Sequence, residues 1–140
     1  MTILNISQVS KTFPGAGGGT TALQATDLRV AENDFITILG PSGCGKSTLL
    51  RMVAGLDVPT TGQIQLDGKP VTGPGADRGM VFQSYTLFPW LTVLQNVCFG
   101  LREKGFAPDA QLAIAHEYVG KVGLKGFENH FPKQLSGGMQ

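Results

Sequence analysis

The stretch LGPSGCGKST, residues 39–48, follows the apolar run FITIL and precedes a helical pattern. A glycine-dense turn between a strand and a helix gives up backbone entropy and side-chain packing, so something other than stability is expected to select it. The stretch matches the pattern G-x-x-x-x-G-K-[S/T], in the strand–loop–helix context that this pattern requires. The sequence therefore predicts a phosphate-binding loop in an α/β chain.

The residue types in this loop suit contact with phosphate. Glycines allow backbone N–H groups to converge on an anion, and the helix N-terminus adds its dipole. We expect Lys46 to reach the β- and γ-phosphates and Ser47 to offer its hydroxyl to Mg²⁺. The residues predicted to line the phosphate site are Gly40, Pro41, Ser42, Gly43, Cys44, Gly45, Lys46, Ser47 and Thr48. The alternative is a glycine turn without a ligand.

Alternating or wholly apolar runs predict several strands. They lie at residues 2–10, 21–30, 33–40, 62–66 and 79–83. Asp67-Gly68 has the composition of a tight turn after the fourth of these strands. The runs at 33–40 and 79–83 predict short buried strands, and the first of them is typical of a parallel sheet that is covered on both faces.

Apolar residues recur at helical spacing in three places. A helix over 46–55 follows the loop, and Thr92 with Gln95 forms a capping-box pattern at the start of a second helix. A third helix follows Pro108, and its predicted apolar side consists of Leu112, Ala115, Val119 and Val122. Ser136 is a good N-cap residue and predicts the start of a further helix.

Composition excludes some classes of protein. With 140 residues, of which 41% are hydrophobic and 15% charged, the chain fits one globular domain, and its net charge of +1 gives no basic field for nucleic acid. The longest apolar runs are far shorter than the roughly 20 residues that cross a bilayer. We expect a cytosolic chain without a secretory signal, whose two cysteines are reduced thiols.

Three motifs in this order resemble those of the ATP-binding cassette (ABC) family. They are GPSGCGKST, VFQ and LSGGMQ, and the resemblance extends from KTF to the last residue. It implies an α/β P-loop NTPase fold, with a RecA-like core and an antiparallel β subdomain in residues 1–86. Residues 87–140 are then most of an α-helical subdomain that ends at the signature motif, in a domain that is incomplete at its C-terminus.

The resemblance also implies ATP and Mg²⁺ as cofactors and assigns roles to further residues. Lys46 and Gln83 are the catalytic residues, and Ser47 and Gln83 contact the metal. Phe13 matches the aromatic residue that stacks on adenine. The signature motif meets the γ-phosphate of ATP held by the opposite subunit, through residues expected to include Ser136, Gly137, Gly138 and Gln140.

The implied protein is the ATP-binding subunit of an importer, peripheral on the cytoplasmic face of the cell membrane. It is expected to form a homodimer, to contact a transmembrane permease near the aromatic-rich stretch SYTLFPWLTV, and through the permease to serve a solute-binding protein. The stretch GPGADRGMVFQ followed by LFPWLTVLQNVCFGL resembles importers of nitrate, sulfonate and taurine. We therefore expect a small anion as the solute.

The family places its Walker B aspartate, the glutamate after it and the switch histidine downstream of the signature motif. These residues are absent here, so the 140-residue chain is expected not to hydrolyse ATP efficiently by itself. Three alternatives remain open. They are a P-loop nucleotide kinase, an ABC ATPase that does not act in transport, and a truncated fragment that only binds nucleotide or a partner.

Overall fold

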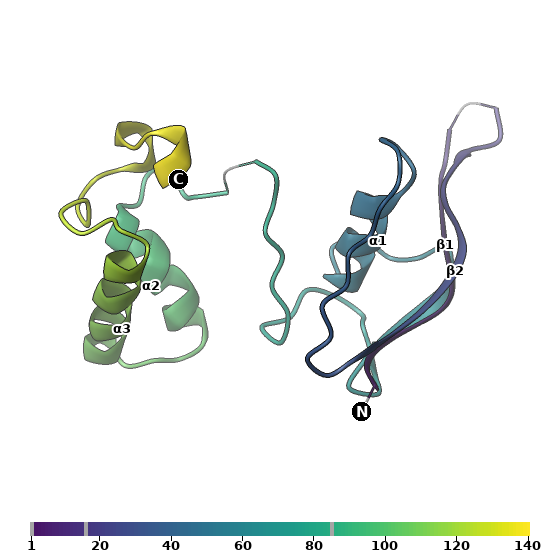
Figure 1. The fold of residues 1–140 in the computed structure, drawn as a ribbon, viewed down its shortest axis with the longest axis horizontal. Helices are drawn as coiled ribbons and strands as arrows, with labels where there is room; N and C mark the ends of the chain where they lie inside the picture. The colour runs from purple at the N-terminus through teal and green to yellow at the C-terminus, as the bar shows by residue number, and fades with distance from the viewer. Residues whose placement is uncertain (1, 16, 85) are drawn as a thin grey trace. The chain divides into compact units, whose positions relative to one another are not determined.

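The structure is a computed structural model that describes residues 2–15, 17–84 and 86–140. The chain divides into two compact units, Met1–Met80 and Val81–Gln140. The first unit contains the β-sheet and α1, and the second contains α2 and α3 (Figure 1).

The first unit is built on an antiparallel sheet of four strands in the order β2-β1-β3-β4. The strands are β1 (Thr2–Phe13), β2 (Thr20–Ala31), β3 (Thr61–Leu66) and β4 (Lys69–Pro70). The strands predicted at 2–10, 21–30 and 62–66 are therefore confirmed. The Asp67-Gly68 turn joins β3 to β4 with positive φ at both residues, as the tight hairpin turn requires.

The core of this unit lies between the sheet and α1 (Lys46–Val53). Ile6, Val9 and Ile64 from the sheet are buried together with Leu49 and Met52 of α1. Leu49 and Met52 are three residues apart and therefore share one helix face. This packing confirms the predicted helix and holds it on the sheet, with the glycine loop immediately before it.

Two predicted strands are absent from the structure. Residues 34–40 and 79–83 have no strand hydrogen bonds, and Phe35, Leu39 and Val81 are 93%, 86% and 98% exposed. The predictions were wrong because an apolar run favours burial, whereas a strand forms only where a neighbour completes its hydrogen bonds. Among the described residues, the sheet consists of antiparallel pairs and offers no parallel neighbour to either run.

The second unit consists of α2 (Val93–Glu103), α3 (Pro108–Lys121) and two short 3-10 helices, η1 (Pro132–Gln134) and η2 (Gly137–Met139). The predicted capping box is confirmed, because Gln95 N donates to Thr92 Oγ1 at 3.3 Å and Thr92 N donates to Gln95 Oε1 at 2.9 Å. Both predicted helices and the helical start at Ser136 are present.

The apolar side predicted for α3 is only partly buried. Ala115 and Val119 are buried, but Leu112 and Val122 are 46% and 66% exposed, so the prediction was wrong for these two residues. The physical reason is that residues of α2 and of the C-terminal segment cover Val119 but leave Leu112 and Val122 exposed to solvent. Val119 forms a small core with Val93 and Leu135.

Within the described ranges, no helix combines the length and the hydropathy that a membrane crossing needs.

Candidate nucleotide-binding site

The glycine loop approaches β2 closely at its last residue, Gly45. Gly43 and Gly45 have φ values of 80° and 95°, in the left-handed region that L side chains rarely adopt. Gly45 is also buried, and a Cβ atom there would lie 2.3 Å from the carbonyl oxygen of Ala22 on β2. Only glycine therefore fits at position 45, and this contact fixes where the loop leads into α1.

Lys46 is the first residue of α1, and its side chain folds back into the loop. Its Nζ donates to the carbonyl oxygens of Gly40 at 2.8 Å and Pro41 at 2.6 Å, and lies 3.6 Å from Cys44 Sγ. In the part of the chain that the structure describes, Lys46 forms no ion pair. The ammonium group thus lies inside the loop on neutral acceptors, which charged phosphate oxygens can replace with stronger hydrogen bonds.

The N-terminus of α1 has the chemistry of an anion site. Its first-turn N–H groups have no acceptor within the helix. Within the described residues, no side chain caps this end and no acidic residue lies in the first turn. Ser47 is an exposed residue and is the second residue of the helix. The loop therefore fits a triphosphate, and the Ser47 hydroxyl is an oxygen ligand of the kind that Mg²⁺ accepts.

Phe13 lies at the end of β1, in the same unit as the loop. Phe13 is 41% exposed, and Lys11 Nζ lies 5.1 Å from its ring centroid. The ring is therefore outside the buried core, where a base could stack on it. Stacking on adenine stays a prediction.

Gln83 and the signature residues belong to the second unit, so the structure brings together Lys46, Ser47 and the loop glycines but groups Gln83 separately. Gln83 is exposed and lies outside any strand. Its predicted contacts with the metal and the attacking water stay a prediction.

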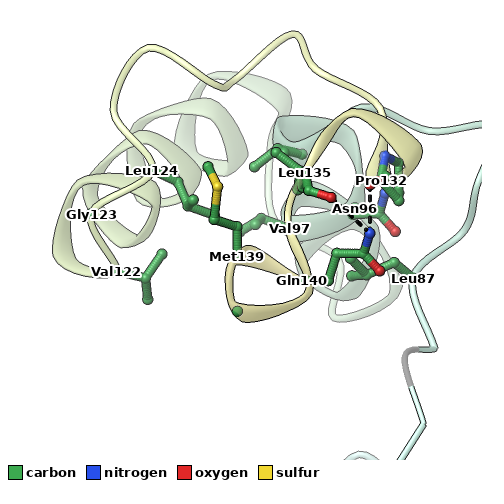
Figure 2. Close-up of a pocket in the computed structure, with 12 residues that line it drawn as sticks. Leu87, Asn96, Val97, Val122, Gly123, Leu124, Pro132, Leu135, Met139 and Gln140 are labelled. Atoms are coloured by element: carbon green, nitrogen blue, oxygen red, sulfur yellow. Dashed lines mark hydrogen bonds between the residues drawn. The ribbon is translucent and has the colours of Figure 1, made fainter.

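The signature segment is anchored at both ends and exposed between them. Leu135 is buried, and Gln140 Nε2 donates to the carbonyl oxygens of Pro132 at 2.7 Å and Leu135 at 3.3 Å (Figure 2). Ser136 and the two glycines after it are exposed. Ser136 occupies the N-cap position of η2, but its side chain makes no capping hydrogen bond within the described residues.

A pocket of about 480 Å³ lies beside this segment (Figure 2). Its walls are mostly apolar side chains from α2, from the segment after α3 and from the segments around η1 and η2, including Val93, Val97, Leu124, Leu135 and Met139. This lining does not suit a triphosphate, so the pocket is not a candidate for the nucleotide itself.

Sequence reasoning missed the role of Asn96. Its Oδ1 accepts from Phe88 N at 2.9 Å, and its Nδ2 donates to the carbonyl oxygens of Phe88, Leu91 and Thr92 at 3.2, 3.1 and 3.0 Å. Asn96 therefore closes the turn that leads into α2. The only signal in the sequence was an amide residue inside an apolar helical pattern.

Comparisons with known proteins agree with this geometry. The family described as ABC transporter matches residues 23–140. An uncharacterized ABC transporter ATP-binding protein from Methanocaldococcus jannaschii is 56% identical over 137 residues, covering 98% of this chain and 51% of that protein. The nitrate import ATP-binding protein NrtD from a Synechocystis species is 49% identical over 137 residues, covering 98% of this chain and 52% of that protein.

A taurine import ATP-binding protein, TauB from Burkholderia thailandensis, is 50% identical over 133 residues, covering 95% of this chain and 51% of that protein. The chain thus spans about half the length of these curated relatives. Among solved structures, the dimeric post-hydrolysis state of the ATP-binding cassette MJ0796, bound to ADP and Pi, has a TM-score of 0.86 at 33% identity. That match covers 98% of this chain and 65% of the other.

These findings confirm the predicted fold class. The antiparallel sheet, the loop and the helices are those of a P-loop NTPase of the cassette type. The loop geometry, the signature segment and the family match over residues 23–140 together show that this chain belongs to the ABC transporter family.

Proposed function

We propose that this chain is part of the ATP-binding subunit of an ABC importer, which couples ATP binding and hydrolysis to the transport of a small anion such as nitrate, a sulfonate or taurine. The observation that carries the proposal is the Lys46 ammonium group, held on loop carbonyls at the N-terminus of α1. The names of the nitrate and taurine import relatives support the choice of solute.

In the proposed site, residues 40–48 hold the triphosphate. Backbone N–H groups of the loop and of the first turn of α1 donate to its oxygens, and Lys46 exchanges its carbonyl partners for the β- and γ-phosphates. Ser47 holds Mg²⁺, which when bound neutralises charge that develops on the phosphates. Phe13 stacks on the base.

The second unit contributes the remaining proposed contacts. Gln83 orients the attacking water and contacts the metal. In a homodimer, Ser136, Gly137, Gly138 and Gln140 of a second copy belong to the segment that faces the γ-phosphate. The exposure of this segment supports that role, and so does the dimeric form of the similar cassette MJ0796. Hydrolysis is proposed for the whole protein, since the relatives are about twice as long as this chain.

The proposed setting is the cytoplasmic face of the cell membrane. A permease receives the aromatic stretch before α2, where Trp90 is 69% exposed and its ring centroid lies 5.6 Å from that of Phe88. A solute-binding protein acts through the permease, and nucleic acid has no part. Residues 1–86 form the β subdomain with the phosphate loop, and residues 87–140 form the helical subdomain.

The test is a Lys46→Ala substitution in the full-length subunit. We expect ATP hydrolysis to be abolished with the thermal unfolding temperature unchanged, because Lys46 stabilises transferred charge and lies outside the core. Lys69→Ala is the matched control, because Lys69 is an exposed lysine on β4 of the same unit. Wild-type phosphate release by Lys46→Ala would refute the site.

A further inference from the structure

Lys11 of β1 makes two contacts that the sequence did not indicate. Its Nζ donates to the carbonyl oxygen of Val58 at 2.6 Å, and the same Nζ lies over the Phe13 ring, 5.1 Å from the ring centroid. An ammonium group at this distance is attracted by the negative face of an aromatic ring. Lys11 therefore connects the Phe13 ring to the segment between α1 and β3.

The segment around Val58 is itself anchored to α1 and to β1. On one side of Val58, Asp57 pairs with Arg51 of α1, whose Nε lies 2.7 Å from Asp57 Oδ2. On the other side, Thr60 Oγ1 accepts from Thr12 N of β1 at 3.0 Å. The carbonyl group that binds the Lys11 ammonium thus lies between two anchors, so the ammonium has a defined place relative to α1.

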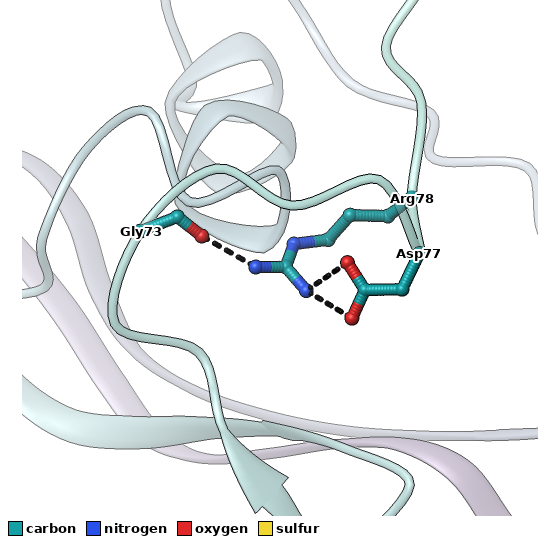
Figure 3. Close-up of polar contacts among 3 residues, drawn as sticks. All are labelled: Gly73, Asp77 and Arg78. Carbon is teal, nitrogen blue, oxygen red and sulfur yellow. Dashed lines mark hydrogen bonds and ion pairs between the residues drawn. The ribbon is translucent and has the colours of Figure 1, made fainter. Parts of the chain in front are cut away.

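The turn that follows α1 also packs against the loop after β4. A Cβ atom at Gly55, two residues after the helix, would lie 2.1 Å from the carbonyl oxygen of Gly73. Arg78 Nη2 donates to this carbonyl oxygen, and Arg78 Nη1 donates to both carboxylate oxygens of Asp77 at 2.8 Å (Figure 3). Together with the close approach of Gly45 to β2, this packing orders both ends of the helix that follows the phosphate loop.

The register of the sheet determines how far the end of β1 lies from the phosphate loop. Phe13 pairs with Thr20 of β2, whereas Gly45 lies beside the carbonyl oxygen of Ala22 on the same strand. Two residues along a strand correspond to about 7 Å. A ribose and one phosphate group bridge a length of this order between a base and a β-phosphate. The spacing therefore suits a nucleotide whose phosphates occupy the loop.

We propose that Lys11 is a positioning residue for Phe13 and thereby raises the affinity of the site for the base of ATP. This inference rests on the proposed function, in which Phe13 stacks on the base. The ammonium group occupies one face of the ring, so the base stacks on the opposite face. Phe13 is partly exposed, which leaves room for this second contact.

The charge of Lys11 acts on stacking as well as on position. The faces of aromatic rings are negative, so two stacked rings repel each other unless they are offset. A cation on one face of the Phe13 ring draws electron density toward itself and lowers this repulsion at the opposite face. The Val58 carbonyl keeps the cation in place, because a lysine without a partner is spread over many rotamers.

The experiment measures the equilibrium affinity of the full-length protein for MgATP and for inorganic tripolyphosphate, which has no base. We expect Lys11→Met to weaken ATP binding about two- to fivefold, the size of a cation–π contact at an exposed site, and to leave tripolyphosphate binding unchanged. The assay contains 0.15 M salt, in which the Debye length of about 8 Å screens the loss of a distant charge.

Two further variants and a kinetic measurement accompany this test. Lys11→Arg keeps a cation and hydrogen-bond donors, so it should restore ATP affinity to near the wild-type level. Lys69→Met is the matched control, because it removes the same charge from an exposed lysine of the same unit, and both affinities should stay at the wild-type level. In steady-state hydrolysis, Lys11→Met should raise KM for ATP with kcat unchanged.

A double-mutant cycle with Phe13→Ala separates positioning from a general effect of the charge. In the Phe13→Ala background, Lys11→Met should weaken ATP binding no further. Wild-type ATP affinity in Lys11→Met, full additivity in the cycle, or an equal loss of ATP and tripolyphosphate affinity overturns the inference and leaves the proposed function intact. Wild-type ATP affinity in Phe13→Ala overturns the proposed stacking and the inference with it. If Lys11→Met does not fold, the same measurements on Lys11→Gln decide.

Discussion

The phosphate loop and the signature segment both contain glycine, but for different reasons. At Gly45 the backbone is left-handed and a Cβ atom would lie 2.3 Å from the Ala22 carbonyl oxygen, so its own unit requires glycine. At Gly138 a Cβ atom would meet no atom of the described chain within 4 Å, and φ is not in the left-handed region. The contrast teaches that the fold explains the first glycine, whereas nothing in the described part of its own unit requires the second.

The side chains of the two segments differ in the same way. Lys46 is held by two carbonyl groups of its own loop, so the first segment is organised before a nucleotide arrives. Ser136 is exposed, and among the described residues its side chain does not cap η2. The first segment is thus ordered by contacts within its own loop, whereas the second is an exposed surface, which suits the contact with a second subunit that we propose.

The largest expected effect comes from Gly45→Ala in the full-length protein. The left-handed backbone alone costs about 1–2 kcal/mol for a residue with a Cβ atom. The contact with β2 adds to this cost and displaces the loop, so we expect loss of ATP binding and a lower unfolding temperature. Gly43→Ala is the matched control for stability, because Gly43 is also left-handed but a Cβ atom there has open space. Equal destabilisation by the two variants would contradict the steric account.

Ser136→Arg should have the next largest effect. The long cation lies where we propose that the γ-phosphate of the opposite subunit binds, and it obstructs closure of the dimer. We expect hydrolysis to fall by about 100-fold or more, the size of effect seen when catalytic positioning is lost. ATP affinity should remain at the wild-type level, because the phosphate loop is untouched. The measurements are equilibrium ATP binding and steady-state phosphate release.

The same variant distinguishes the alternatives. A nucleotide kinase has no use for Ser136, so transfer of phosphate to a small-molecule acceptor would favour the kinase. Hydrolysis at the wild-type rate would refute a site shared between two subunits.

Gly138→Ala is a smaller change at the same surface. A methyl group in open space leaves the free energy of unfolding within about 0.5 kcal/mol of wild type, as is usual for surface substitutions. The added methyl group keeps the γ-phosphate of ATP on the opposite subunit away from the backbone N–H groups of the signature segment. We therefore expect the rate of hydrolysis to fall about tenfold, which is equivalent to about 1.4 kcal/mol in the barrier. Gly120→Ala in α3, where a Cβ atom also has open space, is the control and should hydrolyse ATP normally.

The smallest effect concerns the two thiols, one in each unit. Cys44 in the phosphate loop is exposed, whereas Cys98 in α2 is partly buried, and burial raises the pKa of the Cys98 thiol. A raised pKa leaves less thiolate at neutral pH, so Cys44 should react severalfold faster with a thiol reagent, and the difference should shrink as the pH rises. Saturating MgATP should slow the reaction of Cys44 with the reagent and leave the reaction of Cys98 unchanged. Peptide mapping by mass spectrometry gives both rates, and equal labelling of Cys44 with and without nucleotide would contradict the binding site.

Much of the fold and of the first site could be predicted because the signals are local. The loop motif, the helix after it, the Thr92 capping box and the Asp67-Gly68 turn each depend on residues within a few positions of one another. Arg78 and Asn96 were missed for the opposite reason. Their importance lies in the backbone carbonyl groups that they reach, and any residue type supplies a carbonyl group, so no sequence pattern marks the partner.

The sequence by itself determined that this protein has a glycine loop of the phosphate-binding type before a helix, three of its strands and a helical segment with a signature motif, and the family resemblance carried by these motifs implied the antiparallel subdomain. Only the tertiary structure decided that the apolar runs at 33–40 and 79–83 are not strands, that Gly45 is required by β2, and that Arg78 donates to the carbonyl oxygen of Gly73. The physical reason is the separation along the sequence over which each kind of interaction acts. Motifs and caps are short-range chemistry, whereas strand pairing and close backbone approach depend on residues that are distant in sequence.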